Sequence, residues 1–336
     1  MRSAPPALPA PPVLIALLAL LAVLALLAPS FFAPDNLRDV VISNAMVQII
    51  AVGMTMVILT GQVDVAVGAT AGVCAVLSAT LARQGVPPPL AALAATLAGG
   101  LIGLVSGVLV ARLRLPSIVV TLALLVILRD GLRWTTDGAW VGALPATFQW
   151  FGLGQAGGQT LLIGLMLAVI AAGAWFLWAT PLGRAVYATG SDAESAQLLG
   201  LRPGRVVMAS FVACGVLTGL AAALNASRFA EVPGTVVTGL EMKVIAAVVV
   251  GGTSITGGRG SIAGTVIGVA LLGAIGTGLT FLGVSAYWER ALQGAIILAA
   301  ILYETVARRG QPHKQPAQPI QPIQPDQPAP SRAASA

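Results

Sequence analysis

The residue types that usually do chemistry are sparse in this sequence. The one histidine, His313, lies in a proline- and glutamine-rich stretch, and the two cysteines, Cys74 and Cys214, stand singly in apolar runs. A metal site needs several such ligands, and thiol–imidazole catalysis needs both partners close together. The two lysines, Lys243 and Lys314, follow methionine and histidine, so neither belongs to the Gly-Lys-Ser/Thr of a phosphate-binding loop. The sequence therefore predicts no enzyme, no cofactor, no metal and no ATP site of its own.

Charged residues are rare throughout the chain, which indicates a membrane environment. Of 336 residues, 57% are hydrophobic and 9% are charged, and the mean hydropathy is +0.91, whereas soluble domains carry about 25% charged residues. The net charge of +6 comes from arginines at the ends of apolar segments, singly or in pairs. Because they form no basic stripe, a nucleic-acid partner is not expected, and membrane topology explains them.

Long apolar runs predict the elements of the fold. A helix needs about 20 apolar residues to cross the hydrocarbon core, and fewer where protein shields its ends. We expect an all-α fold, a polytopic membrane bundle of about ten transmembrane helices. The expected segments are 12–28, 40–61, 65–82, 87–111, 115–128, 159–180, 206–227, 244–256, 261–283 and 291–303.

The loops between these segments set the expected topology. With the N-terminus placed inside, arginine and lysine are moderately enriched in the inner loops, so both termini are predicted to be cytoplasmic. The expected parts are a short N-terminus at 1–11, a transmembrane domain at 12–306 and a disordered Pro/Gln-rich tail at 307–336. A cleavable signal peptide at 12–28 is the less favoured interpretation, because many more spans follow.

The longest polar loop on the predicted cytoplasmic side, residues 181–205, contains a helix-start signal. Ser191 followed three residues later by Glu194 matches a capping box, so a helix of about two turns should begin there. Gly200 can supply its left-handed end, and Pro203 bars continuation. Isolated helices need about 12–15 residues in water, so this one must dock, either on its own bundle or on another protein. Its apolar stripe would consist of Ala193, Ala196 and Leu199.

A second signal is the glycine-rich segment "VVVGGTSITGGRGSIAGTVIG". So much glycine is incompatible with one continuous helix. The helix must break at membrane depth or at its edge, where irregular backbone is tolerated only if protein buries it or it lines a water-filled path. We therefore predict a hinge or gate in the translocation pathway, and tight packing for Gly264 and Gly268. The hinge residues would be Gly251, Gly252, Thr253, Gly257, Gly258 and Gly260.

The centres of the expected spans hold no Asp, Glu, Lys, Arg or His. Ion-coupled carriers usually keep such groups at membrane depth, because something must bind the driving ion. An ion-coupled secondary transporter or channel is therefore the alternative rather than the first interpretation, and a membrane scaffold for a protein complex is a further one. If transport is uphill, the energy must enter from another polypeptide.

Three motifs resemble, in order and spacing, those of one known family: the membrane-spanning permease subunits of ribose-type ABC sugar importers, including xylose, galactose, rhamnose and autoinducer-2 systems. The motifs are "GMTMVILTGQVDVAVGA", "TPLGRAVYATGSDAESAQLLGL" and "IAAVVVGGTSITGGRGSIAGTVIG". The resemblance covers residues 36 to about 305. It implies a permease for a neutral monosaccharide-like solute, working by alternating access in a bacterial inner membrane.

The resemblance also implies an architecture and partners. The fold would be a ten-span bundle related to vitamin-B12-type importers, with a second copy or a sister permease completing a central path. Cytoplasmic ABC ATPase subunits, a periplasmic sugar-binding protein and membrane lipid would be the other partners. The helix near Ser191 would be the coupling helix that seats in an ATPase cleft. The residues expected to couple are Gly183, Arg184, Ser191, Glu194 and Gly200, although the default role of Arg184 is that of a membrane-edge anchor.

The first motif departs from the family pattern at two positions. Gln62 and Ala66 replace a glycine and a serine, whereas Gly61, Asp64 and Gly68 match it. We expect Asp64 at the cytoplasmic turn between two spans, where its carboxylate caps the second helix; direct contact with a sugar is the less favoured role.

One carboxylate near the expected outer mouth has two possible roles. Glu241 could contact the binding protein or pair with Arg228.

Overall fold

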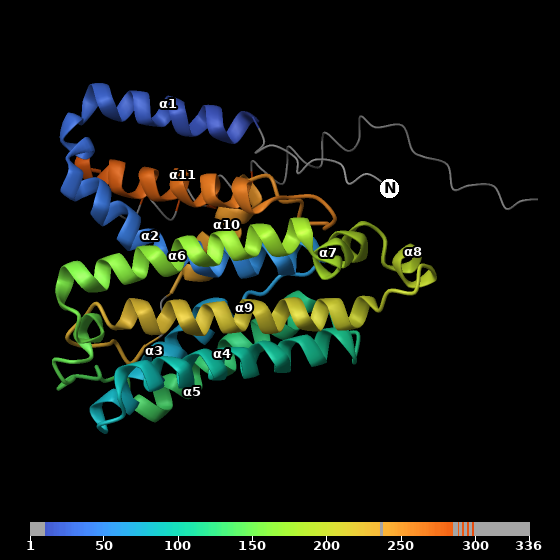
Figure 1. Ribbon diagram of the computed structural model, residues 1–336, viewed down its shortest axis with the longest axis horizontal. Helices are drawn as coiled ribbons and strands as arrows, with labels where there is room; N and C mark the ends of the chain where they lie inside the picture. The colour runs from blue at the N-terminus through green and yellow to red at the C-terminus, as the bar shows by residue number, and fades with distance from the viewer. Residues whose placement is uncertain are drawn as a thin grey trace, which may run out of the picture.

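The fold is described from a computed structural model, which describes residues 11–235 and 238–284 and the single positions 288, 291, 294, 295 and 298. The predicted terminal segments 1–10 and 307–336, and most of the expected span 291–303, lie outside the described residues. Helices in chain order are α1 (Pro11–Leu27), η1 (Pro29–Phe32), α2 (Pro34–Leu59), α3 (Val67–Arg83), α4 (Pro88–Ala111), α5 (Ser117–Thr136), η2 (Gln149–Gly152), α6 (Gly154–Ala179), α7 (Pro181–Ser191), α8 (Ala193–Leu198), α9 (Pro203–Ala226), α10 (Leu240–Val250) and α11 (Ile262–Phe281) (Figure 1).

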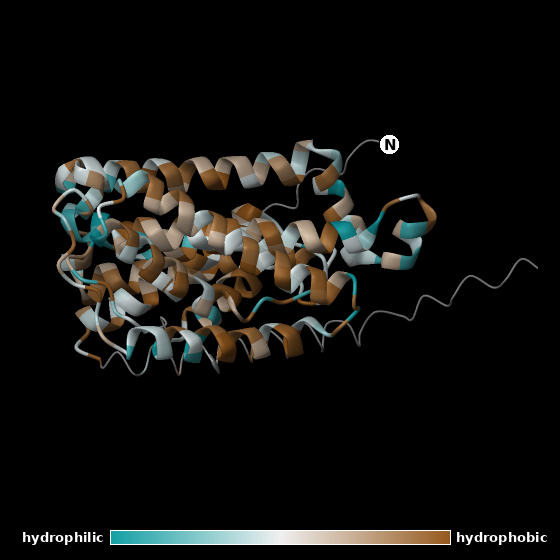
Figure 2. Ribbon diagram, turned by 90° about the horizontal axis from the view of Figure 1, so that it is seen from below, coloured by the Kyte–Doolittle hydropathy of each residue, from teal (hydrophilic) through white to brown (hydrophobic). Residues whose placement is uncertain are grey.

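The predicted all-α class is confirmed for this part of the chain, where extended pairing is limited to one bridge between Val141 and Val232. Five helices, α2, α4, α6, α9 and α11, are 20–26 residues long and apolar enough to cross a membrane. At 1.5 Å per residue, such helices reach about 30 Å or more. Figure 2 shows the apolar middle of the bundle with hydrophilic residues gathered toward its two ends.

Several boundaries differ from those expected. Helix α5 continues past 128 to Thr136, because its charged final turns reach the polar end of the bundle, where helix formation needs no apolar run. Helix α10 ends at Val250, short of 256, because the doubled glycine follows at once. Pro203, expected to stop a helix, is instead the first residue of α9, a position where its missing amide hydrogen costs nothing.

Helix α2 forms the centre of the bundle, and 83% of its most apolar 18-residue stretch is buried. Beside it, α4 and α9 pack so closely that backbone atoms of one helix contact backbone atoms of the other. A Cβ on Gly103 would overlap the carbonyl oxygen of Phe211, and one on Gly107 would lie 3.0 Å from the Cα of Met208. Small residues allow such a close approach. In a membrane, where lipid is as apolar as the side chains, this close packing and not the hydrophobic effect holds helices together. By contrast, only 17% of the most apolar 18-residue stretch of α6 is buried, so much of the apolar surface of α6 faces outward.

Glu241 does not pair with Arg228 among the described residues, and its contact with a binding protein stays a prediction. Its Oε1 lies 3.8 Å from Nη2 of Arg129 on α5, and its side chain is 8% exposed. Arg228 instead donates to the carbonyl of Ile42 and to Asn225 Oδ1, both at 3.2 Å. The ion pair therefore ties the start of α10 to the last turns of α5.

Arg129→Met is expected to lower the free energy of unfolding by about 1–3 kcal/mol, because it leaves the nearly buried Glu241 carboxylate without its cation. Arg133→Met, one turn further along α5 at an exposed position, should change it by less than about 0.5 kcal/mol. Thermal unfolding of both purified variants in detergent measures the difference. Equal stability of the two would show that the ion pair contributes nothing.

Candidate coupling site

The three sequence motifs meet at one end of the bundle, through their backbones. The amide of Gly258 donates to the carbonyl of Leu59, the last residue of α2, at 2.9 Å. Gly190, the penultimate residue of α7, packs against both: a Cβ there would overlap the Leu59 oxygen and lie 2.6 Å from the Gly258 nitrogen. Segments about 70 and 130 residues apart in the chain thus form one contact, which we call the three-way junction of Leu59, Gly190 and Gly258.

The glycine-rich segment is an irregular loop between α10 and α11, as its composition predicts. Gly252, Gly257, Gly258 and Gly260 all have positive φ, from 73° to 153°. At Gly257 the requirement is steric as well, because a Cβ would lie 2.7 Å from the amide nitrogen of Gly61. The loop is therefore built on glycine both for its left-handed backbone and for close contact with the end of α2.

The other members of this segment serve the same loop. Gly251 packs on Gly264, so the α10–α11 pair is in close contact where the loop begins. Thr253 is 2% exposed, and its Oγ1 has no hydrogen-bond partner among the described residues. Gly268 packs on Ala247, which agrees with the tight helix packing expected there.

Helix α7 positions the junction, and the sequence analysis missed it. Thr180 caps it by accepting from the Gly183 amide at 3.0 Å, and Pro181 occupies its first position. Gly183 turns the chain tightly, because a Cβ there would lie 2.6 Å from the Cα of Leu177 at the end of α6. Further along, the Tyr187 hydroxyl donates to the Gly260 carbonyl at 3.0 Å. The Thr-Pro pair is the signal that could have predicted this helix.

The expected capping box at Ser191 and Glu194 is wrong. Ser191 is the last residue of α7, where it contacts Gly258, and Asp192 is the cap of α8. Asp192 Oδ1 accepts from the amides of Glu194 (3.0 Å) and Ser195 (3.1 Å), and its second oxygen accepts from the Ser195 hydroxyl. A carboxylate with two oxygens satisfies three donors, which a serine hydroxyl cannot do. These bonds, the Ser195 hydroxyl first, lower the pKa of Asp192, so the cap is ionised at neutral pH.

Helix α8 projects beyond the bundle at the same end (Figure 1). It holds six residues, fewer than the two turns expected, and Gly200 follows it with φ +82°. Ala196 is buried, whereas Leu198 is 89% and Leu199 is 81% exposed. The expected stripe of Ala193, Ala196 and Leu199 therefore does not lie on one face. Arg184, at the start of α7, is also exposed.

Asp64 lies deeper than a surface turn. Its side chain is 4% exposed, and its Oδ1 accepts from the Ala66 amide at 2.9 Å, just before α3 begins at Val67. The expected helix cap is therefore wrong: the Asp64 carboxylate holds the turn before α3 from inside the bundle, and no side chain caps α3 itself. Gly68 is buried in the first turn of that helix.

The described part of the chain is an apolar helical bundle with five helices long and apolar enough to cross a membrane. The family model of branched-chain amino acid transport system permease components matches residues 36–301, and the chain belongs to this family. The ribose import permease protein RbsC of Escherichia coli (strain K12) is 36% identical over 281 residues, which cover 82% of this chain and 88% of RbsC. The autoinducer 2 import system permease protein LsrC of Escherichia coli (strain K12 / DH10B) is 38% identical over 265 residues, 79% of this chain and 78% of LsrC. No solved structure matches.

Proposed function

We propose that this chain is the permease subunit of an ABC importer that moves a monosaccharide or a related small polar solute across a bacterial inner membrane. Relatives whose names state ribose and autoinducer-2 import support the solute class. The observation that carries the mechanism is the three-way junction, because it links the projecting α8 to the end of the central helix α2 without any intervening side chain.

The junction suits the transmission of force. In this proposal α8 seats on a cytoplasmic ATPase subunit through its exposed Leu198 and Leu199. Movement of α8 pulls α7, whose last residues press on Leu59 and on the glycine loop. Since backbone atoms meet backbone atoms, no side chain can rotate to absorb the movement. The glycines then act as the hinge that lets α10 and α11 change their angle to α2.

The finer architecture follows the same proposal. The chain would have ten spans in a vitamin-B12-importer-like arrangement, both termini in the cytoplasm and a coupling loop at 181–205. Two copies, or this chain and a sister permease, would enclose the path, and a periplasmic binding protein would deliver the solute. The outward apolar surface of α6 is available for lipid or for that second permease.

Reconstitution in liposomes tests the proposal. The complex co-purified with its ATPase is expected to take up labelled ribose or autoinducer-2 only with ATP, and the chain alone is expected to take up neither. Uptake by the chain alone would contradict it.

One observation favours the alternative of an ion-coupled carrier, namely the buried carboxyl of Asp64. Asp64→Asn separates the two functions, since an asparagine oxygen can still accept from the Ala66 amide but cannot bind or release a proton. If the chain is an ABC importer permease, we expect uptake by the Asp64→Asn variant within about twofold of the parent. The hydrogen bond from the Ala66 amide is retained in the variant, and it keeps the structure of the turn. For a proton-coupled carrier, the Asp64→Asn variant would lose uptake, and an ionophore would reduce uptake by the parent protein.

A further inference from the structure

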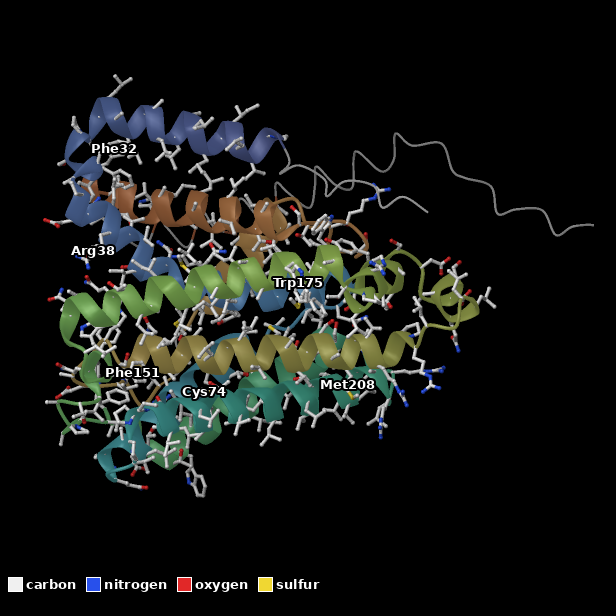
Figure 3. The ribbon with its side chains drawn as sticks, in the orientation of Figure 1. Phe32, Arg38, Cys74, Phe151, Trp175 and Met208 are labelled. Carbon is white, nitrogen blue, oxygen red and sulfur yellow. The ribbon has the colours of Figure 1, made fainter. Side chains whose placement is uncertain are left out.

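A basic pocket of about 600 Å³ lies between α8 and the end of the bundle, separate from the three-way junction. Four arginines line it, and the polar face of α8 forms the opposite wall. The charged and amide residues are Arg112, Arg114, Arg202, Arg205, Glu194 and Gln197. Figure 3 shows nitrogen-bearing side chains gathered at this end of α4 and α9, beyond Met208.

The charges of this pocket are not balanced within the described residues. Glu194 is the one carboxylate in its lining, and no ion pair joins any of the four arginines to a described acidic side chain. Helix α9 also begins here, and its cap residue Arg202 provides no side-chain acceptor. The positive end of a 24-residue helix therefore adds to the four guanidinium groups. An anion with several oxygens is the ligand that this arrangement suits.

The pocket lies at the end of the apolar helix α4. Arg112 and Arg114 follow directly after the apolar helix α4, and they alternate with Leu113 and Leu115, which are 61% and 43% exposed. Above them α4 presents Leu101, 63% exposed, to the outside. Arginines next to exposed leucines place charge at the headgroups and apolar surface at the acyl chains.

The surface expected to seat on an ATPase is a different one. Leu198 and Leu199, at the C-terminal end of α8, are exposed and do not line the pocket, to which α8 contributes Ala193, Glu194 and Gln197. We infer that this pocket binds the phosphate-bearing headgroup of an anionic lipid from the leaflet on the α8 side, with the acyl chains along α4.

Lipid retention by the full-length purified chain tests this inference. In native mass spectrometry, phosphatidylglycerol is expected to remain bound at least about tenfold more than phosphatidylcholine, because only the former carries net negative charge. The double variant Arg114→Gln/Arg205→Gln should lose at least about tenfold of the phosphatidylglycerol adduct. The matched variant Arg83→Gln/Arg133→Gln removes two exposed arginines outside the pocket and should retain it.

Three results would overturn the inference: equal retention of both lipids, equal loss in both double variants, or the same stabilisation against heat by inorganic phosphate as by phosphatidylglycerol. If the pocket double variant does not fold, the single Arg114→Gln variant and a salt titration of the parent replace it. Salt should then remove phosphatidylglycerol and leave phosphatidylcholine. None of these readouts requires transport, so they do not depend on the proposed function.

Discussion

Gly190→Ala is expected to reduce solute uptake at least about a hundredfold and to lower the yield of folded protein. The new methyl group would overlap the carbonyl oxygen of Leu59 and lie 2.6 Å from the nitrogen of Gly258. Both are backbone atoms, so the hydrogen bond between them must break or α7 must move away. Overpacking of this kind costs about 1–3 kcal/mol, and more where no side chain can yield.

Gly164→Ala is the matched control for this prediction. Gly164 is also helical, in α6, but nothing lies within 4 Å of its Cβ position. There the substitution should raise stability by about 0.5–1 kcal/mol through helix propensity and leave uptake unchanged. Size-exclusion profiles and uptake in membrane vesicles measure both variants. Normal uptake by Gly190→Ala would show that the junction is not needed for transport.

Asp192→Ala is expected to uncouple transport while the protein still inserts into the membrane. The substitution removes the acceptor for two amides and one hydroxyl at the start of α8. A six-residue helix that projects into water has little else to keep it folded, so uptake should fall about fivefold or more. ATP hydrolysis by the assembled complex should continue without matching uptake.

Asp192→Asn provides the control, because asparagine caps helices about as well as aspartate and should keep most of the uptake. Equal losses for Ala and Asn would assign the effect to the charge rather than to the cap. Glu194→Pro would be a weaker test of the cap than Asp192→Ala. Glu194 is the second residue of α8, and proline is tolerated in the first turn of a helix.

The glycine loop illustrates what local sequence can predict. Crowded glycines disfavour any continuous helix, so the break after Val250 follows from propensity alone. The helix near Glu194 is likewise a local property, although its cap is Asp192 and not the expected Ser191. Ser191 is not available, because α7 continues through it and packs it on Gly258, and this leaves Asp192 to begin α8.

Gly190 and Tyr187 were not predicted, for a physical reason. A contact between backbone atoms requires only the absence of a side chain, and an isolated glycine looks the same whether it faces space, as at Gly164, or another chain segment, as at Gly190. Tyr187 likewise shows nothing in sequence of its bond to the Gly260 carbonyl.

The sequence by itself determined that the chain is apolar, with helices able to cross a membrane, and that it lacks the Gly-Lys-Ser/Thr of a phosphate-binding loop, because span length, charge scarcity and motif chemistry are local quantities. It also determined where the glycine loop lies and that a short helix lies near Glu194. Only the tertiary structure decided that the end of α2, the end of α7 and the glycine loop form one junction, and that four arginines surround one pocket. Those groups are brought together by close helix packing over long sequence separations, and no local pattern encodes that packing.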